Sequence, residues 1–172
     1  VKDVHAYGVE LQSSLEVGDE VITTSNTFWA TAEAIWLVGA TPVLVDCDPK
    51  TRNIDVTKIE EKITPKTKMI VPVHLYGQPA DMPAVAAIAK KHNLKIVEDC
   101  AQALGAAGDG WKIGQYSDAV ATSFITAKNL GTFGDAGALV TNSAEIDAAV
   151  RRLRNHGSTA RNVHSYGFNS RL

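Results

Sequence analysis

The chain is poor in the features that mark secreted, membrane-bound or nucleic-acid-binding proteins. Its 172 residues include only two cysteines, Cys47 and Cys100, which are too few for a disulfide framework. The net charge is −2, so no positive excess would attract nucleic acid or a membrane surface. No apolar run reaches the roughly 18 residues that a membrane span needs, and no signal peptide is recognisable. We therefore expect two buried, reduced thiols in a cytoplasmic protein without nucleic-acid or membrane partners.

The sequence also lacks internal repeats, low-complexity segments and linkers, which favours a single domain. Hydrophobic residues make up 45% of the chain and charged residues 21%, as in ordinary globular proteins. A chain of this length can bury a real core.

Strand-like runs alternate with helix-like runs along the chain. We expect strands at 21–24, 41–46, 69–74, 95–99, 119–124 and 137–141, and helices at 28–39, 55–63, 81–92 and 143–153. Continuous apolar strands separated by helices predict an α/β fold in three layers, with a mostly parallel sheet between helices. The gap before Gly137 is too short for a crossover helix, so the last strand is expected to run antiparallel.

Polar and aromatic side chains follow the expected strands at their carboxyl ends, where open parallel sheets bind ligands. In chain order these are Thr27, Phe28 and Trp29; Asp46 and Asp48; His74, Tyr76 and Gly77; Asp99 and Gln102; and Ser123 and Lys128. Together they have the composition of an active site, although a single polar residue at a strand end often serves only the turn.

Lys128 lies in a loop followed closely by Gly131, Gly134 and Gly137. By itself it would be read as a solvated lysine in a glycine-rich loop. Six sequence blocks around it change that interpretation. They are Gly18–Ile22, Thr27–Thr31, Pro72–Met82, Val97–Gly105, Ser123–Asp135 and Gly167–Leu172.

In this order, the blocks resemble those of the DegT-type sugar nucleotide aminotransferases, which are fold type I pyridoxal-phosphate-dependent enzymes. The resemblance covers nearly the whole chain and implies the large, catalytic domain of such an enzyme. It also implies amino transfer from glutamate, or glutamine, to a nucleotide-linked keto-sugar. One departure is the stretch 125–127, where the family usually carries a proline and a small residue.

The resemblance assigns five cofactor-binding roles to residues that the chemistry suits. Lys128 would form the Schiff base with pyridoxal 5'-phosphate and then transfer the proton as the catalytic base. Asp99 would pair with the protonated pyridine nitrogen, which keeps the ring an electron sink. Gln102 would address the ring hydroxyl, Ser123 the phosphate, and Phe28 the ring face. Trp29 is the alternative to Phe28, and core packing remains open for both aromatics.

Further positions are implied for the substrate and for a second subunit. His74 is assigned either to turn structure or to a place near the substrate, and Tyr76 to the substrate. Asn169 matches a position that reaches the phosphate of the neighbouring subunit's cofactor, which implies a homodimer. No role follows for His156, and no metal site is assigned.

Two parts of the family pattern are missing. Residues 4–15 contain no version of the glycine-threonine loop that binds phosphate at a helix N-terminus, and no C-terminal small domain follows. Residues 1–172 are therefore expected to be one large domain, as a fragment of a longer protein. The alternative function is a truncated, inactive homologue that folds and dimerises without turnover.

Two other activities of the same fold are disfavoured. Sugar dehydratases replace the lysine with histidine, so Lys128 argues against that activity. Cysteine desulfuration does not fit the block His74-Leu75-Tyr76-Gly77.

Overall fold

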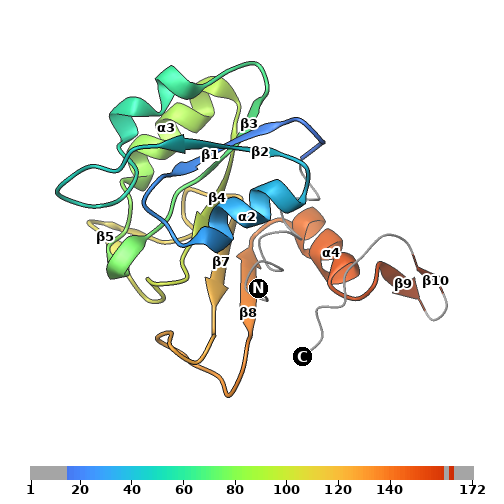
Figure 1. Cartoon of the computed structure of the whole chain (residues 1–172). Coiled ribbons are helices and arrows are strands. Elements are labelled where there is room, and N and C mark those ends of the chain that lie inside the picture. Colours follow the sequence, from blue (N-terminus) through green and yellow to red (C-terminus); the bar gives the residue numbers. More distant parts are fainter. Residues whose placement is uncertain (1–14, 161–162, 165–172) are drawn as a thin grey trace.

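The computed structural model describes residues 15–160 and 163–164. One six-stranded sheet has the strand order β2-β1-β3-β4-β7-β8 (Figure 1). Its strands are β1 (Glu20–Thr24), β2 (Thr41–Val45), β3 (Thr67–Val71), β4 (Lys95–Asp99), β7 (Ala119–Ser123) and β8 (Gly137–Thr141). The α-helices of the described residues are α2 (Trp29–Leu37), α3 (Met82–His92) and α4 (Ala144–Leu153).

The sheet is parallel from β2 to β7 and ends in one antiparallel strand, β8. Helices or 3-10 turns connect β1 to β2, β2 to β3 and β3 to β4, whereas the connection from β4 to β7 contains a short β-hairpin; each connection has the length that a crossover requires. The segment between β7 and β8 contains no helix, and β8 consequently returns beside β7 in the opposite direction. Both the mostly parallel sheet and the antiparallel last strand are confirmed.

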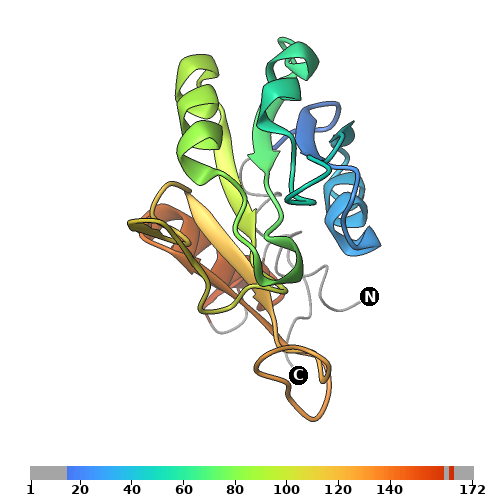
Figure 2. The same ribbon diagram turned by 90° about the vertical axis from the view of Figure 1, so that its left-hand side faces the viewer.

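Neighbouring residues of each central strand pack into different apolar clusters, because side chains alternate between the two faces of a sheet. Val21 and Met69 pack with α2, whereas Ile22 and Ile70 pack with α3 and the turns before β3. Helical layers therefore lie on both faces, as the two orthogonal views show (Figures 1 and 2). The predicted three-layer α/β/α architecture is confirmed.

Two helices begin at residues whose side chains satisfy free backbone N–H groups. Asp81 accepts a 3.1 Å hydrogen bond from the Ala84 N–H at the start of α3, and Ser143 accepts one of 3.3 Å from the Ile146 N–H at the start of α4. Asn93 ends α3 in the left-handed conformation, with φ +54°.

The expected helix at 55–63 is wrong. This segment forms two 3-10 turns, η1 (Val56–Lys58) and η2 (Glu60–Lys62). Asp55 caps the first turn through the Thr57 N–H. Nine residues are too few for an isolated helix to be stable, so tertiary burial decides the conformation. Ile59 joins the turns and is completely buried under the sheet.

A small hairpin was not expected. β5 (Ala107–Gly108) pairs antiparallel with β6 (Trp111–Lys112), and the two-residue connection is Asp109-Gly110. Asp-Gly is a strong hairpin signal because its second residue must adopt a positive φ, which is +76° at Gly110. A second short pair, β9 (Ser158–Ala160) with β10 (Val163–His164), was also missed.

The cysteines are free thiols, as predicted. Cys100 is buried, but Cys47 is only half-buried, which corrects the expectation that both are enclosed. Within residues 15–160 and 163–164, no helix has the length and apolar character needed to cross a membrane. The same residues contain no group of three or more side chains suited to hold a metal ion.

The hairpin generates a stability prediction. A Cβ added at Gly108 would lie 2.0 Å from Cε2 of the Trp111 indole. Gly108→Ala must therefore displace the ring from its packing, and we expect a loss of about 1–3 kcal/mol in the free energy of unfolding, measured by urea denaturation. Gly134→Ala is the control, since no atom lies within 4 Å of its added Cβ. Equal stability of the two variants would contradict the prediction.

Candidate active site

A hollow opens at the carboxyl ends of β4 and β7, beside the start of α2. It encloses about 440 Å³, a volume that includes solvent space at its open mouth. Its lining comes from four separate parts of the chain: Thr27, Phe28, Ala30, Thr31, Val73, Leu75, Asp99, Ala101, Gln102, Thr122, Ser123 and Lys128. Five predicted site residues are in this set: Phe28, Asp99, Gln102, Ser123 and Lys128.

Asp99 is the last residue of β4, and its carboxylate is held by two donors. Thr31 Oγ1 donates to Oδ2 at 2.8 Å, and the Ala101 N–H donates to Oδ1 at 3.0 Å. Thr31 Oγ1 also lies 2.9 Å from Thr27 Oγ1. Since Thr31 uses its only proton on Asp99, Thr27 must donate to Thr31. This series of hydrogen bonds fixes the orientation of the buried Asp99 carboxylate, which can still accept a further hydrogen bond from a ligand.

Gln102 reaches the hollow from the turn after β4. Its Oε1 accepts a hydrogen bond of 2.9 Å from the Tyr76 N–H. An N–H group can only be accepted by the carboxamide oxygen, so the oxygen is committed to the loop. The NH₂ group of Gln102 is therefore the part that it can offer to a ligand.

Ser123 and Lys128 are brought together by the tight segment that follows β7. Ser123 is buried, and its Oγ accepts a hydrogen bond from the Ile125 N–H at 3.3 Å. The Lys128 N–H bonds the Ile125 carbonyl at 2.8 Å, which folds the segment back toward the sheet. Lys128 is half-buried, and among the described residues its ammonium group has no hydrogen-bond or ion-pair partner. It is an available amine at the wall of the hollow.

The same segment contains a glycine that its backbone path requires. A Cβ at Gly131 would lie 2.4 Å from the Thr126 carbonyl oxygen, a contact that no side chain could tolerate. Thr132 completes the fold-back by bonding the Phe124 carbonyl through both its N–H and its hydroxyl. Gly131 therefore serves a close approach of two backbone segments beside Lys128.

Phe28 and Trp29 stand at the start of α2 with different directions. Phe28 is the N-cap residue in extended conformation and lines the hollow with 69% of its surface exposed. Trp29 is 72% exposed and does not line the hollow. The core-packing alternative fits neither residue, and the geometry favours Phe28 over Trp29 as the aromatic that meets a ligand.

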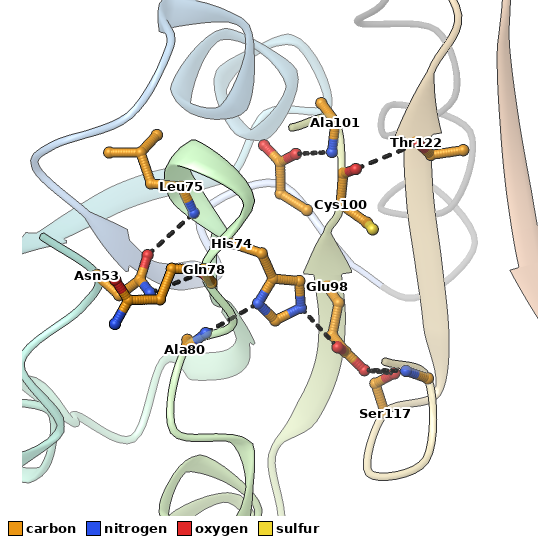
Figure 3. A network of polar contacts seen from close by, with 12 residues as sticks. Asn53, His74, Leu75, Gln78, Ala80, Glu98, Cys100, Ala101, Ser117 and Thr122 are labelled. Atoms are coloured by element: carbon orange, nitrogen blue, oxygen red, sulfur yellow. Dashed lines mark hydrogen bonds and ion pairs between the residues drawn. The ribbon is translucent and has the colours of Figure 1, made fainter. Parts of the chain in front are cut away.

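His74 is not among the residues that line the hollow, and it belongs to a separate network of polar contacts (Figure 3). Its imidazole is completely buried; Nε2 is 2.7 Å from Glu98 Oε2, and Nδ1 accepts from the Ala80 N–H at 3.0 Å. Both ring nitrogens are thereby occupied within the fold, so the geometry favours the turn-structure alternative for His74 over direct substrate contact, and its role stays a prediction. Tyr76 is 73% exposed and does not line the hollow, so its substrate role stays a prediction.

Some expectations and omissions concern residues elsewhere. Asn169 lies outside the described residues. Thr27 and Thr31 were in a recognised block but received no role; Thr27 precedes the N-cap of α2 and Thr31 lies in its first turn, where their hydroxyls meet at 2.9 Å. Glu98 was also missed; a carboxylate within the apolar run of β4 was the available signal, since buried charges need partners.

The two carboxylates beside Cys100 and its burial determine its chemistry. Burial, and to a lesser extent the negative charges of Glu98 and Asp99, raise the pKa of the Cys100 thiol to about 11. The nucleophilic thiolate is therefore scarce at neutral pH, and Cys100 is inert.

Comparison with known proteins gives consistent matches. The model of the DegT/DnrJ/EryC1/StrS aminotransferase family matches residues 5–172. A UDP-N-acetyl-3-dehydro-alpha-D-glucosamine 3-aminotransferase of Acidithiobacillus ferrooxidans is 52% identical over 162 residues, covering 92% of this chain and 44% of that protein.

Two solved structures resemble the fold closely. DesV of S. venezuelae, in complex with a ketimine intermediate, has a TM-score of 0.95 and 45% identity, covering 99% of this chain and 46% of DesV. NtdA of Bacillus subtilis, with bound cofactor PMP, has a TM-score of 0.90 and 39% identity, covering 97% and 39%. The chain spans less than half the length of these relatives.

The thiol environments lead to a reactivity prediction. At pH 8, iodoacetamide should alkylate the half-buried Cys47 at least tenfold faster than Cys100, because reaction requires thiolate and access. Cys100 should become reactive only as the pH approaches 11, where its thiol ionises in the folded chain. Over the same rise in pH, the stability that the folded chain gains from the protonated thiol is lost. Peptide mass spectrometry after timed quenching measures both rates. Equal rates in the folded chain at pH 8 would contradict the assignment.

Proposed function

Because the chain belongs to the DegT/DnrJ/EryC1/StrS aminotransferase family, we propose that it is the large catalytic domain of a pyridoxal-phosphate-dependent aminotransferase. The amino group would move from glutamate, or glutamine, to a keto-sugar linked to a nucleotide. The observation that carries the proposal is the convergence of Lys128, Asp99 and Ser123 on one hollow. A cytoplasmic location, in keeping with the free thiols, is part of the same proposal.

The lining of the hollow suits pyridoxal phosphate in its donor and acceptor chemistry. The group offers an aldehyde, a phosphate, a ring hydroxyl and a pyridine nitrogen, and the hollow contains a matching amine, hydroxyl, carboxamide and carboxylate. The Asp99 carboxylate is oriented by Thr31 and Ala101 yet still has acceptor capacity. A structural carboxylate would need no such unused capacity, so this arrangement fits a protonated ring nitrogen as its partner.

When bound, the cofactor supplies an aldehyde that takes up amines and a ring that withdraws electrons from the neighbouring carbon. Lys128 would bond the aldehyde through Nζ and, once released, hold or transfer a proton at that same atom. Asp99 would keep the ring nitrogen protonated by accepting its hydrogen bond. Ser123 Oγ would donate to the phosphate, and Phe28 would cover the ring and exclude water. Asn169 keeps its predicted role in a partner's site.

The substrate class follows from relatives and not from the hollow itself. The relative from Acidithiobacillus ferrooxidans is named for a UDP-linked keto-sugar aminated at carbon 3. A sugar dehydratase is disfavoured because Lys128 is a lysine at the position where those enzymes have histidine.

The first experiment tests Lys128 as the cofactor-binding amine. The purified chain is mixed with pyridoxal phosphate, reduced with borohydride and mapped by mass spectrometry. We expect the adduct on Lys128 in the wild type, and at least a tenfold loss of total adduct in Lys128→Ala. Lys90→Ala, which removes an exposed lysine of α3, is the control and should bind normally. Undiminished adduct in Lys128→Ala would refute the assignment.

A second step separates the enzyme from the inactive homologue. Glutamate is added to the cofactor-loaded chain, and the visible absorbance of the bound cofactor is followed. An active domain converts the cofactor to its amine form, so the absorbance changes and 2-oxoglutarate appears in equal amount. Retained cofactor that is converted neither by glutamate nor by glutamine added in its place would favour the truncated, inactive alternative.

A homodimer belongs to the proposal because the loop that carries Lys128 exposes large apolar side chains. Leu130 is 61% exposed, and Phe133 is fully exposed. An exposed apolar cluster at a site of this kind favours association. Sedimentation equilibrium should give twice the 18.4 kDa mass of the chain, with Phe133→Ser shifting the equilibrium toward monomer. A wild-type monomer with full cofactor occupancy would count against it.

A further inference from the structure

The loop between β3 and α3, residues 74–80, has an unusual backbone that needs support. Tyr76 and Gly77 adopt left-handed conformations one after the other, with φ of +56° and +81°. A left-handed tyrosine persists only where surrounding contacts hold it. Besides the backbone hydrogen bonds from His74 N–H to Asp99 and from Gln78 N–H to Leu75, the loop is held by the side chains of His74, Asn53 and Gln102.

The first anchor is His74, whose ring closes the loop from inside (Figure 3). Nδ1 accepts the Ala80 N–H at 3.0 Å, so it carries no proton, and Nε2 must therefore carry the proton and donate to Glu98 at 2.7 Å. This contact is a hydrogen bond from a neutral imidazole to a carboxylate. Protonating Nδ1 would set two N–H groups against each other.

The carboxylate that receives this bond is itself fixed. Glu98 is completely buried, and its Oε1 accepts from the Gly114 N–H at 2.9 Å and from the Ser117 hydroxyl. With His74 it has three donors, which suffices for a buried anion. The loop is thereby tied to the β4 strand and to the segment before β7.

The second anchor is Asn53, which is 2% exposed. Its Oδ1 accepts the Leu75 N–H at 3.0 Å, and its Nδ2 donates to the Gln78 carbonyl at 2.9 Å (Figure 3). Asn53 therefore binds the loop on both sides of the two left-handed residues, Tyr76 and Gly77. The Tyr76 N–H between these points donates to Gln102 Oε1.

We propose that His74, with Asn53, is a positioning residue that holds the Tyr76 N–H where it orients the Gln102 carboxamide. The oxygen of Gln102 is bound by the loop, and its NH₂ group is thereby directed to the hollow as a donor. Val73 and Leu75, on either side of His74, line the hollow, so the loop also shapes its wall. This inference rests on the proposed function, because the acceptor for the NH₂ group is the ring hydroxyl of pyridoxal phosphate.

Single substitutions can separate the two parts of this arrangement, which are the loop contacts that hold the Tyr76 N–H and the NH₂ donor of Gln102. Gln102→Glu retains an oxygen for the Tyr76 N–H but replaces the NH₂ donor by an acceptor. His74→Gln can still donate to Glu98 through its NH₂ group, but its one carboxamide cannot also place an acceptor at the Nδ1 position that the Ala80 N–H requires. Asn53→Asp acts from the other side, since it keeps the acceptor for Leu75 and loses the donor to Gln78. His92→Gln, in an exposed contact with Glu60, is the matched control.

The first readout needs no cofactor: hydrogen exchange at the Tyr76 amide, measured by NMR on the purified chain. We expect protection in the wild type, in Gln102→Glu and in His92→Gln, and an exchange at least tenfold faster in His74→Gln and Asn53→Asp. An unprotected Tyr76 amide in the wild type would overturn the proposal. So would unchanged protection in both loop variants. If one variant does not fold, the other decides.

The second readout is the dissociation constant for pyridoxal phosphate. Gln102→Glu and His74→Gln should each weaken binding at least tenfold, and the double variant should be no weaker than Gln102→Glu alone, because both changes remove the same donor. If the losses in affinity of the two single variants added up in the double variant, the proposal that His74 acts through Gln102 would be wrong. Absence of any adduct on Lys128 in the wild type would instead refute the proposed function, and Tyr76 exchange would then decide the positioning role alone.

Discussion

The arrangement of the site depends on the alternation of side chains at the end of β4. Asp99 faces the hollow beside α2, and Glu98 faces the opposite side, where it binds His74. The single strand β4 thus supplies one carboxylate, Asp99, to the hollow and a second one, Glu98, to the contact with His74. The second is the costlier to disturb, because removing one partner from a buried charged hydrogen bond typically costs about 3–5 kcal/mol. The site therefore stands on a polar contact that no ligand reaches.

The two carboxylates also differ in how much of their hydrogen-bond acceptor capacity is left unused. Glu98 has three donors from the chain and no exposure, so its acceptor capacity is used within the fold. Asp99 accepts from Thr31 and from the Ala101 N–H, and it borders the hollow. Two carboxylates that are adjacent in sequence thus have different surroundings, because they lie on opposite faces of the sheet: Glu98 binds groups of the fold, and Asp99 lines the hollow.

Much of the fold could be predicted because it rests on local patterns. Apolar runs marked the sheet strands, and Asp81 and Ser143 marked two helix starts, since capping acts over three residues. The turns at 55–63 could not be predicted in this way, because the burial of Ile59 under the sheet decides them. The hairpin at Asp109-Gly110 had a local signal that was overlooked.

The site was predictable where chemistry follows strand ends, as for Asp99, Ser123 and Lys128. It was not predictable where partners are distant in sequence. Thr31 donates to a carboxylate 68 positions away, and His74 binds one 24 positions away. A histidine at a strand end looks the same in sequence whether it meets a ligand or holds a loop. Only its three-dimensional partners decide between the two.

The antiparallel return of β8 has a consequence for how such a site changes over time. Ser123 is paired with Gly137 in the ladder, and the Phe124 N–H bonds the Ala136 carbonyl at 2.7 Å, so residues 124–136 leave and rejoin the sheet at one rung (Figure 2). Closing a loop of slightly different length costs little extra entropy. Insertions, deletions or exchanges in this loop therefore leave the strand register intact. Lys128 is thus carried by a segment whose length can change, whereas Asp99 and Ser123, which line the same hollow, belong to strands of the sheet.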